Sequence, residues 1–271
     1  MENKIKEMFP KWCSDDKKKY ELILTDDIDS LVSCALLNKI KGYKINYFYN
    51  FETVYEIKES DTPAIAIDCD LVKGRCWSNH VTMLSANDTV NSKSANLNNI
   101  LKISRENYYQ KFCGSTAMQI WSFYDIPLPD TEEGKMALLA IDGGYLGYYD
   151  KRFINIHSKY LNMLGFNELI EVLEKHTKSE FYDFIQKHNL HKKIGVNRNG
   201  ILTTQIDLAT LQGLFNLDLS RPDKPFYISK ELSRDCPTNL MSNKTYTKDD
   251  FPDMFSVALI YRNKVAFTKN K

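Results

Sequence analysis

The stretch that decides the fold is YELILT at residues 20–25, which runs directly into DDIDS at residues 26–30. A short apolar run that ends in acidic residues is typical of a buried parallel strand, because such strands lack the alternation of half-exposed ones. Between residues 30 and 40 the apolar side chains recur at helical spacing. The opening of the chain therefore predicts a strand followed by a helix.

Two further apolar segments extend this pattern. Residues 44–51 are rich in Ile, Tyr and Phe, and residues 64–67 read AIAI and end again at acids, in Asp68-Cys69-Asp70. This succession predicts an α/β fold with an open, mostly parallel sheet and flanking helices. In such sheets ligands bind beyond the carboxyl ends of the strands, where both acidic clusters fall.

The rest of the chain predicts further helices and a smaller second lobe. Helical patterns cover 115–124 and 132–141, and residues 85–99 are rich in Ser, Asn, Lys and Asp, as in a surface loop. We expect a first lobe at residues 1–150 and a mixed α+β lobe at 151–271. The second lobe has helical patterns in 161–188 and strand patterns at 193–196, 200–206 and 225–228. A hairpin of 255–261 and 264–267 turns at Arg262 and Asn263.

Composition limits the function classes. The 271 residues carry a formal net charge of +1, which argues against nonspecific coating of long nucleic acid and favours a local contact. Residues 1–20 are dense in charge, so we expect no secretory signal, no membrane span and a cytoplasmic location. The six cysteines form no CxxC pair and predict reduced thiols.

The acids that follow the apolar segments are the candidate site. Asp27 and Asp29 are one residue apart, so both can project into one cavity if a cation neutralises them. In isolation, helix capping is the favoured interpretation of this triplet, and Asp26 could belong to that cap. The feature recurs, because Asp68, His80 and Asp142 each follow another core segment.

Carboxylates and imidazole are suitable ligands for Mn²⁺ or Mg²⁺. Two such ions, roughly 3.5–4 Å apart, can hold a hydroxide for in-line attack on phosphorus. The sequence therefore predicts two divalent ions held by Asp27, Asp29, Asp68, His80 and Asp142.

The order of these residues resembles the DHH phosphoesterase family over the first 150 residues. DIDSLVSCALL from Asp27 resembles the first motif, AID ending at Asp68 the second, WSNHVT at residues 77–82 the Asp-His-His motif, and LLAIDGG around Asp142 the fourth. Gly114-Ser115-Thr116 resembles the helix start between the last two motifs. At residues 22–25 no histidine stands where the family carries one, and the third motif keeps only His80, beside Asn79.

The resemblance implies a metal-dependent phosphoesterase, similar to the RecJ-type and oligoribonuclease-like branches. Its substrate would be a phosphorylated small molecule or nucleotide, or the phosphodiester bonds of short single-stranded nucleic acid. His80 would bind metal or contact the phosphate, and Asn79 would bind through its amide oxygen or hold water. The alternative is a noncatalytic, degenerate DHH-like module that binds nucleic acid or a protein partner.

Other residues have two interpretations each. Cys69, Cys76 and His80 could form a zinc cluster, although ordinary buried cysteines are the preferred interpretation. Asp70 is either a residue that supports a metal ligand or a solvated loop residue. Gly143-Gly144 either approaches a phosphate or forms a turn. Four histidines are expected at the surface: His157, His176, His188 and His191. Basic and aromatic residues of the second lobe could hold phosphate and a base, or form a solvated face and a core: Lys192, Lys193, Arg198, Arg221, Arg234, Phe215 and Tyr227.

Overall fold

The computed structural model describes residues 1–271 apart from the side chain of Cys236, and it confirms the α/β class. The chain divides into two compact units. We call residues 1–7, 26–43 and 112–225 the helical unit, and residues 8–25, 44–111 and 226–271 the sheet unit. Each unit is built from separate stretches of chain, and one stretch of the helical unit runs across residue 150. The division at residue 150 into a metal-binding lobe and an accessory lobe stays a prediction.

The sheet unit contains the predicted parallel strands. β1 (Glu21–Leu24) pairs in parallel with β2 (Lys44–Tyr49) on one side and with β4 (Ala64–Ile67) on the other. β5 (Arg75–Trp77) and β6 (Ser94–Ala95) continue the parallel part beyond β4. Both are too short to stand out in the sequence. The hydroxyl of Thr25 donates to the carbonyl of Ile67 at 3.1 Å and joins the carboxyl ends of β1 and β4.

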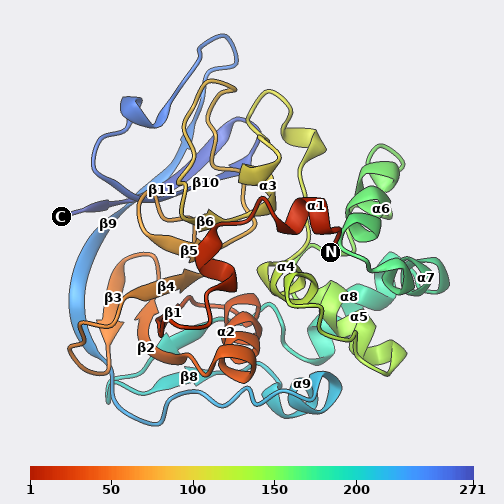
Figure 1. The fold of residues 1–271 in the computed structure, drawn as a ribbon, viewed down its shortest axis with the longest axis horizontal. Coiled ribbons are helices and arrows are strands. Elements are labelled where there is room, and N and C mark those ends of the chain that lie inside the picture. Colours follow the sequence, from red (N-terminus) through yellow and green to blue (C-terminus); the bar gives the residue numbers. More distant parts are fainter. The chain divides into compact units, whose positions relative to one another are not determined.

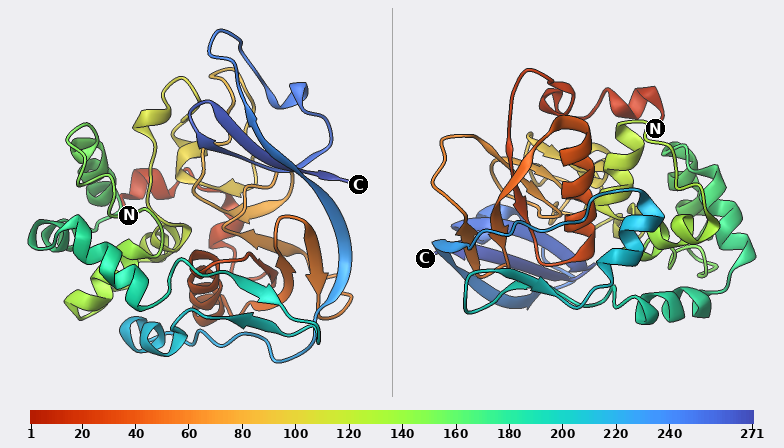
Figure 2. Two further views of the ribbon diagram at one scale, coloured as in Figure 1. Left: turned by 180° about the vertical axis from the view of Figure 1, so that it is seen from behind. Right: turned by 90° about the horizontal axis from the view of Figure 1, so that it is seen from below.

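The other half of the nine-stranded sheet is antiparallel, so the sheet is mixed. β3 (Thr53–Glu56), β9 (Tyr227–Asn239), β11 (Lys264–Asn270) and β10 (Met254–Tyr261) follow β2 in that spatial order. β9 is long and strongly curved (Figures 1 and 2). The predicted hairpin is confirmed, since β10 and β11 pair antiparallel around residues 262–263.

The sheet curls so that its last strand contacts the segment after β4. The amide of Val257 in β10 donates to the carbonyl of Asp70 at 3.0 Å, and that of Leu259 donates to Val81 at 2.8 Å. The pairing of Leu71 with Ser256 and of Val81 with Leu259 is antiparallel. The backbone at residues 70–81 is therefore fixed by β10 as well as by the parallel strands.

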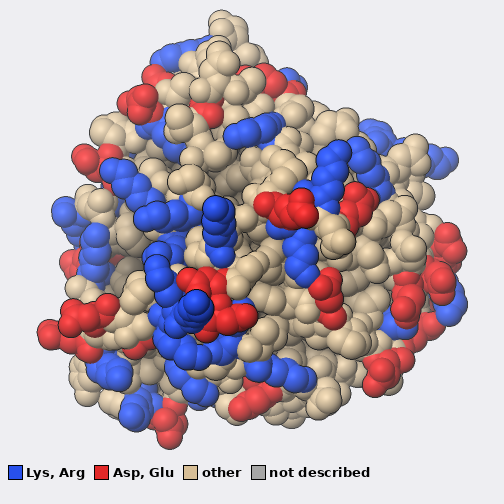
Figure 3. All heavy atoms as spheres, viewed as in Figure 1, with Lys and Arg blue, Asp and Glu red and all other residues tan. Residues whose placement is uncertain are grey.

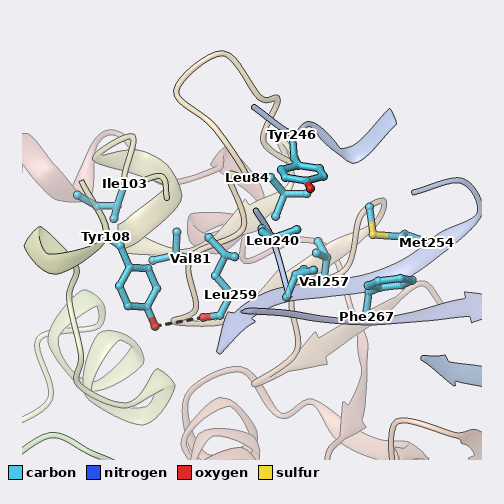
Figure 4. Packing of buried hydrophobic residues seen from close by; sticks show 11 residues of the cluster. Val81, Leu84, Ile103, Tyr108, Leu240, Tyr246, Met254, Val257, Leu259 and Phe267 are labelled. Atoms are coloured by element: carbon cyan, nitrogen blue, oxygen red, sulfur yellow. Dashed lines mark hydrogen bonds between the residues drawn. The ribbon is translucent and has the colours of Figure 1, made fainter. Parts of the chain in front are cut away.

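A hydrophobic cluster lies beneath this contact (Figure 4). Val81, Leu84, Tyr108, Leu259 and Phe267 are each at most 7% exposed and come from segments far apart in the sequence. Burying such side chains contributes roughly 1.5–3 kcal/mol each. The cluster therefore holds the segments of residues 81–108 against the hairpin.

A buried ion pair lies at the edge of the same cluster. The ammonium of Lys248 lies 3.0 Å from Oδ2 of Asp88, and their side chains are 11% and 2% exposed. Asp88 also accepts from the amides of Leu84 and Thr89, at 2.9 and 2.8 Å. Burial lowers the pKa of Lys248, and the neighbouring Asp88 carboxylate only partly opposes this effect. The pair joins the loop after β9 to residues 84–89.

The helical unit confirms the predicted helices at 30–40, 115–124 and 132–141 as α2 (Ile28–Lys41), α4 (Thr116–Phe123) and α5 (Glu132–Ala140). α2 ends at Gly42, whose φ of +71° suits a residue without a Cβ. α2 packs against α4, and α5 contacts α7, α8 and α9. The remaining helices are α1 (Asn3–Lys6), α6 (Ile154–Met163), α7 (Asn167–Lys175), α8 (Lys178–Lys187) and α9 (Leu208–Phe215), with α3 (Leu97–Ile100) in the sheet unit.

A second, two-stranded sheet belongs to the helical unit. β7 (Ile194–Val196) and β8 (Leu202–Thr204) pair antiparallel, as the strand patterns of the second lobe predict. The amide of Ile194 donates to the carbonyl of Asp26 at 2.8 Å, so this hairpin is joined to the segment just before α2. Among the described residues, no helix combines the length and the apolar character needed to cross a bilayer.

Candidate functional site

A carboxylate–histidine pair lies just after β4 and β5 in the sheet unit. Nδ1 of His80 lies 3.1 Å from Oδ2 of Asp70. Asp70 also accepts from the hydroxyl of Ser78 at 2.5 Å and from the amide group of Asn96 at 2.8 Å. The Asp70 side chain is 2% exposed and that of His80 is 40% exposed. The carboxylate is thus fixed inside the protein while the imidazole reaches its surface.

Asparagines from the segment predicted as a surface loop hold the backbone of this site. Nδ2 of Asn96 donates to the carbonyl of His80 at 2.7 Å, and Nδ2 of Asn98 donates to the carbonyl of Asn79 at 2.6 Å. Asn96 and Asn98 are fully buried. The prediction of a surface loop is therefore wrong for residues 94–99, because their amide groups satisfy buried carbonyls that would otherwise be unpaired.

Asp68 belongs to the same edge of the sheet unit. It follows β4 directly, is 8% exposed, and has a φ of +54°. Its amide donates to the carbonyl of Trp77 at 2.8 Å, and this bond holds the turn. Aspartate tolerates the left-handed region better than most residues, but the conformation still costs free energy. Such strain is common where a side chain is aimed for function, so Asp68 stays a candidate site residue.

The contact with Asp70 determines which nitrogen of the His80 ring carries the proton. A carboxylate accepts hydrogen bonds and does not donate them, so Nδ1 of His80 carries the proton in this contact. Nε2 is then the ring nitrogen whose chemistry allows it to take a proton or bind a metal ion. Asp70 thus acquires a role that the sequence left undecided, as the residue that orients His80. The DCD sequence at residues 68–70, with a histidine ten residues after Asp70, is the signal that points to it.

Asp27 of the first acidic motif is engaged within the helical unit. Its carboxylate caps α2 by accepting from the amide of Ser30 at 3.2 Å. The ammonium of Lys193 lies 3.0 Å from Oδ1 of Asp26 and 3.4 Å from Oδ2 of Asp27. Burial opposes the charge of Lys193, but the two carboxylates outweigh it and raise its pKa. The cation beside these acids is therefore a lysine of the chain itself.

Asp29 is buried and caps a second helix. Its two oxygens accept from the amides of Thr116 and Ala117, at 2.7 and 2.8 Å, and Ser33 donates to Oδ1 at 3.4 Å. An anion at the first amides of α4 satisfies unpaired donors and interacts favourably with the helix dipole. Asp29 therefore has a structural role in addition to the metal-binding role predicted for it.

The predicted metal ligands divide between the units. Asp27, Asp29 and Asp142 belong to the helical unit, whereas Asp68, Asn79 and His80 belong to the sheet unit. Asp142 is exposed and follows α5, and Asn79 is 6% exposed. Among the side chains that the structure describes, no group of three or more His, Cys, Asp or Glu is arranged to hold a metal ion. The two-ion site and the binding of Mn²⁺ or Mg²⁺ therefore stay predictions.

The zinc alternative does not fit either. Cys69 and Cys76 are buried in the core of the sheet unit. Burial raises the pKa of Cys76 to about 12 and that of Cys69 well above its usual range. Zinc binds the thiolate, so these buried thiols suit packing better than coordination. The cysteines whose side chains are described are not joined in disulfides.

Two of the four histidines expected at the surface are instead buried. His157 is 4% exposed, and its Nδ1 lies 3.5 Å from Sγ of Cys113. His188 is 3% exposed, and its Nδ1 lies 3.0 Å from Oδ2 of Asp207. Polar neighbours in the sequence suggested exposure, but His157 within α6 and His188 directly after α8 are both buried. His176 is partly exposed and His191 is exposed.

Buried His157 predicts a pH dependence of folding. Burial lowers its pKa from 6.5 to about 4, and a contact with the backbone of Gly144 only partly opposes the shift. Below pH 6.5 the unfolded chain binds the proton more readily, so stability is lost as the pH falls from 6.5 towards 4. We expect this residue to lower the free energy of unfolding by about 2 kcal/mol between pH 7 and pH 5.

Urea titrations at the two pH values measure this effect. His157→Leu should reduce the loss of unfolding free energy between pH 7 and pH 5 by about 2 kcal/mol. His191→Leu, at an exposed position, should leave that loss unchanged. An equal loss in the wild type and in His157→Leu would contradict the assignment.

Three of the basic and aromatic residues of the predicted second lobe have partners within their own unit. Lys193 is bound to the acids beside α2, and Phe215 is 5% exposed and packs against Trp121. Arg234 lies over the ring of Phe51, with 5.7 Å between its guanidinium carbon and the ring centre. These contacts favour structural roles for these three residues.

Fold and site together define an α/β protein with a carboxylate–histidine pair beyond the carboxyl ends of the parallel strands β4 and β5. Comparison with known proteins adds nothing further, since no family model, no curated protein and no solved structure matches the chain.

Proposed function

We propose that the protein hydrolyses phosphoesters, with His80 as the group that handles the proton and Asp70 as the residue that orients it. The observation that carries this proposal is the 3.1 Å contact between Asp70 and Nδ1 of His80, in a chain whose acidic motifs resemble those of DHH phosphoesterases. The expected substrates are phosphodiesters of nucleotides or of short single-stranded nucleic acid.

The chemistry assigned to His80 follows from its geometry. Nε2 takes a proton from the attacking water as the water oxygen forms a bond to phosphorus. The bond from phosphorus to the leaving oxygen breaks, and that oxygen receives a proton from the imidazolium or from solvent. Asp70 keeps Nδ1 protonated and stabilises the positive charge that develops on the ring. Asp68 faces the same edge of the sheet unit from the end of β4.

A hydrolysis assay tests the proposal. Bis(p-nitrophenyl) phosphate, short single-stranded oligonucleotides and cyclic dinucleotides are each incubated with the purified protein in Mn²⁺, in Mg²⁺ and in EDTA. We expect cleavage of at least one substrate, and the three conditions determine whether a divalent ion takes part. If none of the substrates is cleaved under any condition, the proposal fails.

The second candidate function is a noncatalytic DHH-like module that binds nucleic acid or a protein partner. The specific observation in its favour is that the acids of the first motif already have partners in the helical unit. Asp26 and Asp27 contact Lys193, and Asp29 accepts from two amides of α4. Oligonucleotide binding without any cleavage would support this candidate over hydrolysis.

A further inference from the structure

Backbone contacts of the sheet unit bring a strand end with exposed aromatic residues close to the segment that carries His80. Val81, the residue after His80, pairs with Leu259, and Leu259 is followed directly by Ile260 and Tyr261. The hydroxyl of Tyr108 donates to the carbonyl of Leu259 at 3.3 Å (Figure 4). Tyr108 and Leu259 are therefore close to Val81, which follows His80 in the chain.

Large side chains of this region are exposed rather than buried. Tyr261 is 68% exposed, Tyr109 is 55% exposed, and Ile260 is 38% exposed. The guanidinium carbon of Arg262 lies 5.9 Å from the centre of the Tyr109 ring, and Nε of Arg262 donates to the carbonyl of Arg105 at 3.4 Å. An aromatic ring with a cation on one face is a known element of nucleic-acid binding surfaces.

The backbone beneath these rings is rigidly held. Arg105 is 6% exposed and donates to the side chain of Asn263 at 3.1 Å and to the carbonyl of Lys244 at 2.9 Å. Its guanidinium also lies over the ring of Tyr246. Because Arg105 fixes the turn between β10 and β11, the positions of Tyr261 and Arg262 do not depend on a flexible loop.

The local charge is strongly positive although the whole chain is nearly neutral. Segments 102–111 and 260–264 contain five cationic residues and a single acid, Glu106, which accepts from the hydroxyl of Ser104 at 2.7 Å. On the face that Figure 3 shows, positive and negative side chains lie side by side. The cationic residues of the two segments are Lys102, Arg105, Lys111, Arg262 and Lys264.

We propose that Tyr109, Tyr261 and Arg262 form a binding platform for single-stranded nucleic acid. Bases stack on the two rings, and Arg262, Lys102, Lys111 and Lys264, which are at least partly exposed, hold the phosphates. This inference rests on the proposed function for its link to hydrolysis, since it identifies the substrate class that His80 would act on. Stacking on an aromatic ring is tolerant of sequence, so the platform selects exposed bases rather than one base.

Binding of an oligonucleotide is measured in EDTA, so that the affinity is determined without cleavage. A fluorescently labelled 12-nucleotide oligo(dT) is titrated with the full-length protein by anisotropy at 50 mM salt. We expect Tyr261→Ser and Tyr109→Ser to raise the Kd about tenfold each. Arg262→Gln should lower the slope of log Kd against log salt by about 0.7.

Tyr182→Ser is the matched control, because Tyr182 is 46% exposed and has a lysine, Lys178, over its ring. It should leave the Kd unchanged. An abasic oligonucleotide of equal length should bind the wild type at least about tenfold more weakly. The proposal is overturned if the wild type does not bind oligo(dT), if the tyrosine variants bind like the control, or if polyglutamate of equal charge displaces the oligonucleotide equally well. Binding without cleavage would leave the platform intact and refute only the hydrolytic function.

Discussion

Replacing His80 by glutamine is expected to lower the rate of phosphoester hydrolysis by a factor of about 10² to 10⁴. Glutamine fills a similar volume and can still hydrogen-bond Asp70, but it has no lone pair that takes a proton near neutral pH. Because the side chain is 40% exposed and adds little to the core, we expect the melting temperature to change little. The rate is measured on whichever substrate the wild type cleaves.

Three comparisons separate a chemical role of His80 from a structural one. His191→Gln, at an exposed histidine, should keep full activity. Added imidazole should restore part of the activity of His80→Ala. It should not restore Asp70→Asn, in which the ring is still present but is held in the wrong tautomer. Full activity in His80→Gln would refute the acid–base assignment.

Replacing Lys248 by methionine is expected to destabilise the fold by about 3–5 kcal/mol. Methionine preserves most of the side-chain volume, but it leaves the carboxylate of Asp88, which is 2% exposed, as a buried charge without its cation. The amides of Leu84 and Thr89 still donate to Asp88, so we expect the lower part of this range. Urea unfolding of the variant and of the wild type at pH 7 measures the difference.

The double variant Lys248→Met/Asp88→Asn removes both charges and should recover part of the lost stability. Lys244→Met is the control on the same loop, since Lys244 is exposed, and should change the free energy of unfolding by no more than about 0.5 kcal/mol. A loss as small as that of Lys244→Met would show that the buried pair is not what holds this loop.

The sequence by itself determined the class of fold and most of its regular elements. The apolar runs at residues 20–25, 44–51 and 64–67 are strands, and the helical spacing after residue 30 is α2. These segments are decided locally, because burial of a whole strand or of one helix face leaves a periodic pattern in the chain. The hairpin at residues 255–267 was equally readable from its two apolar runs and the short turn between them.

Only the tertiary structure decided what the acids contact. Adjacent acids in the sequence look alike, yet Asp29 caps α4, Asp27 caps α2 beside Lys193, and Asp70 orients His80. The amides of α4 and the ammonium of Lys193 are distant in the sequence from these acids, whereas His80 follows Asp70 by ten residues. Side-chain chemistry can suggest that an acid needs a donor or a cation, but which one it meets depends on how segments far apart in the chain are brought together. For the same reason the surface of Tyr109, Tyr261 and Arg262 left no signal in the sequence, since it exists only where the end of β10 lies beside residues 108–109.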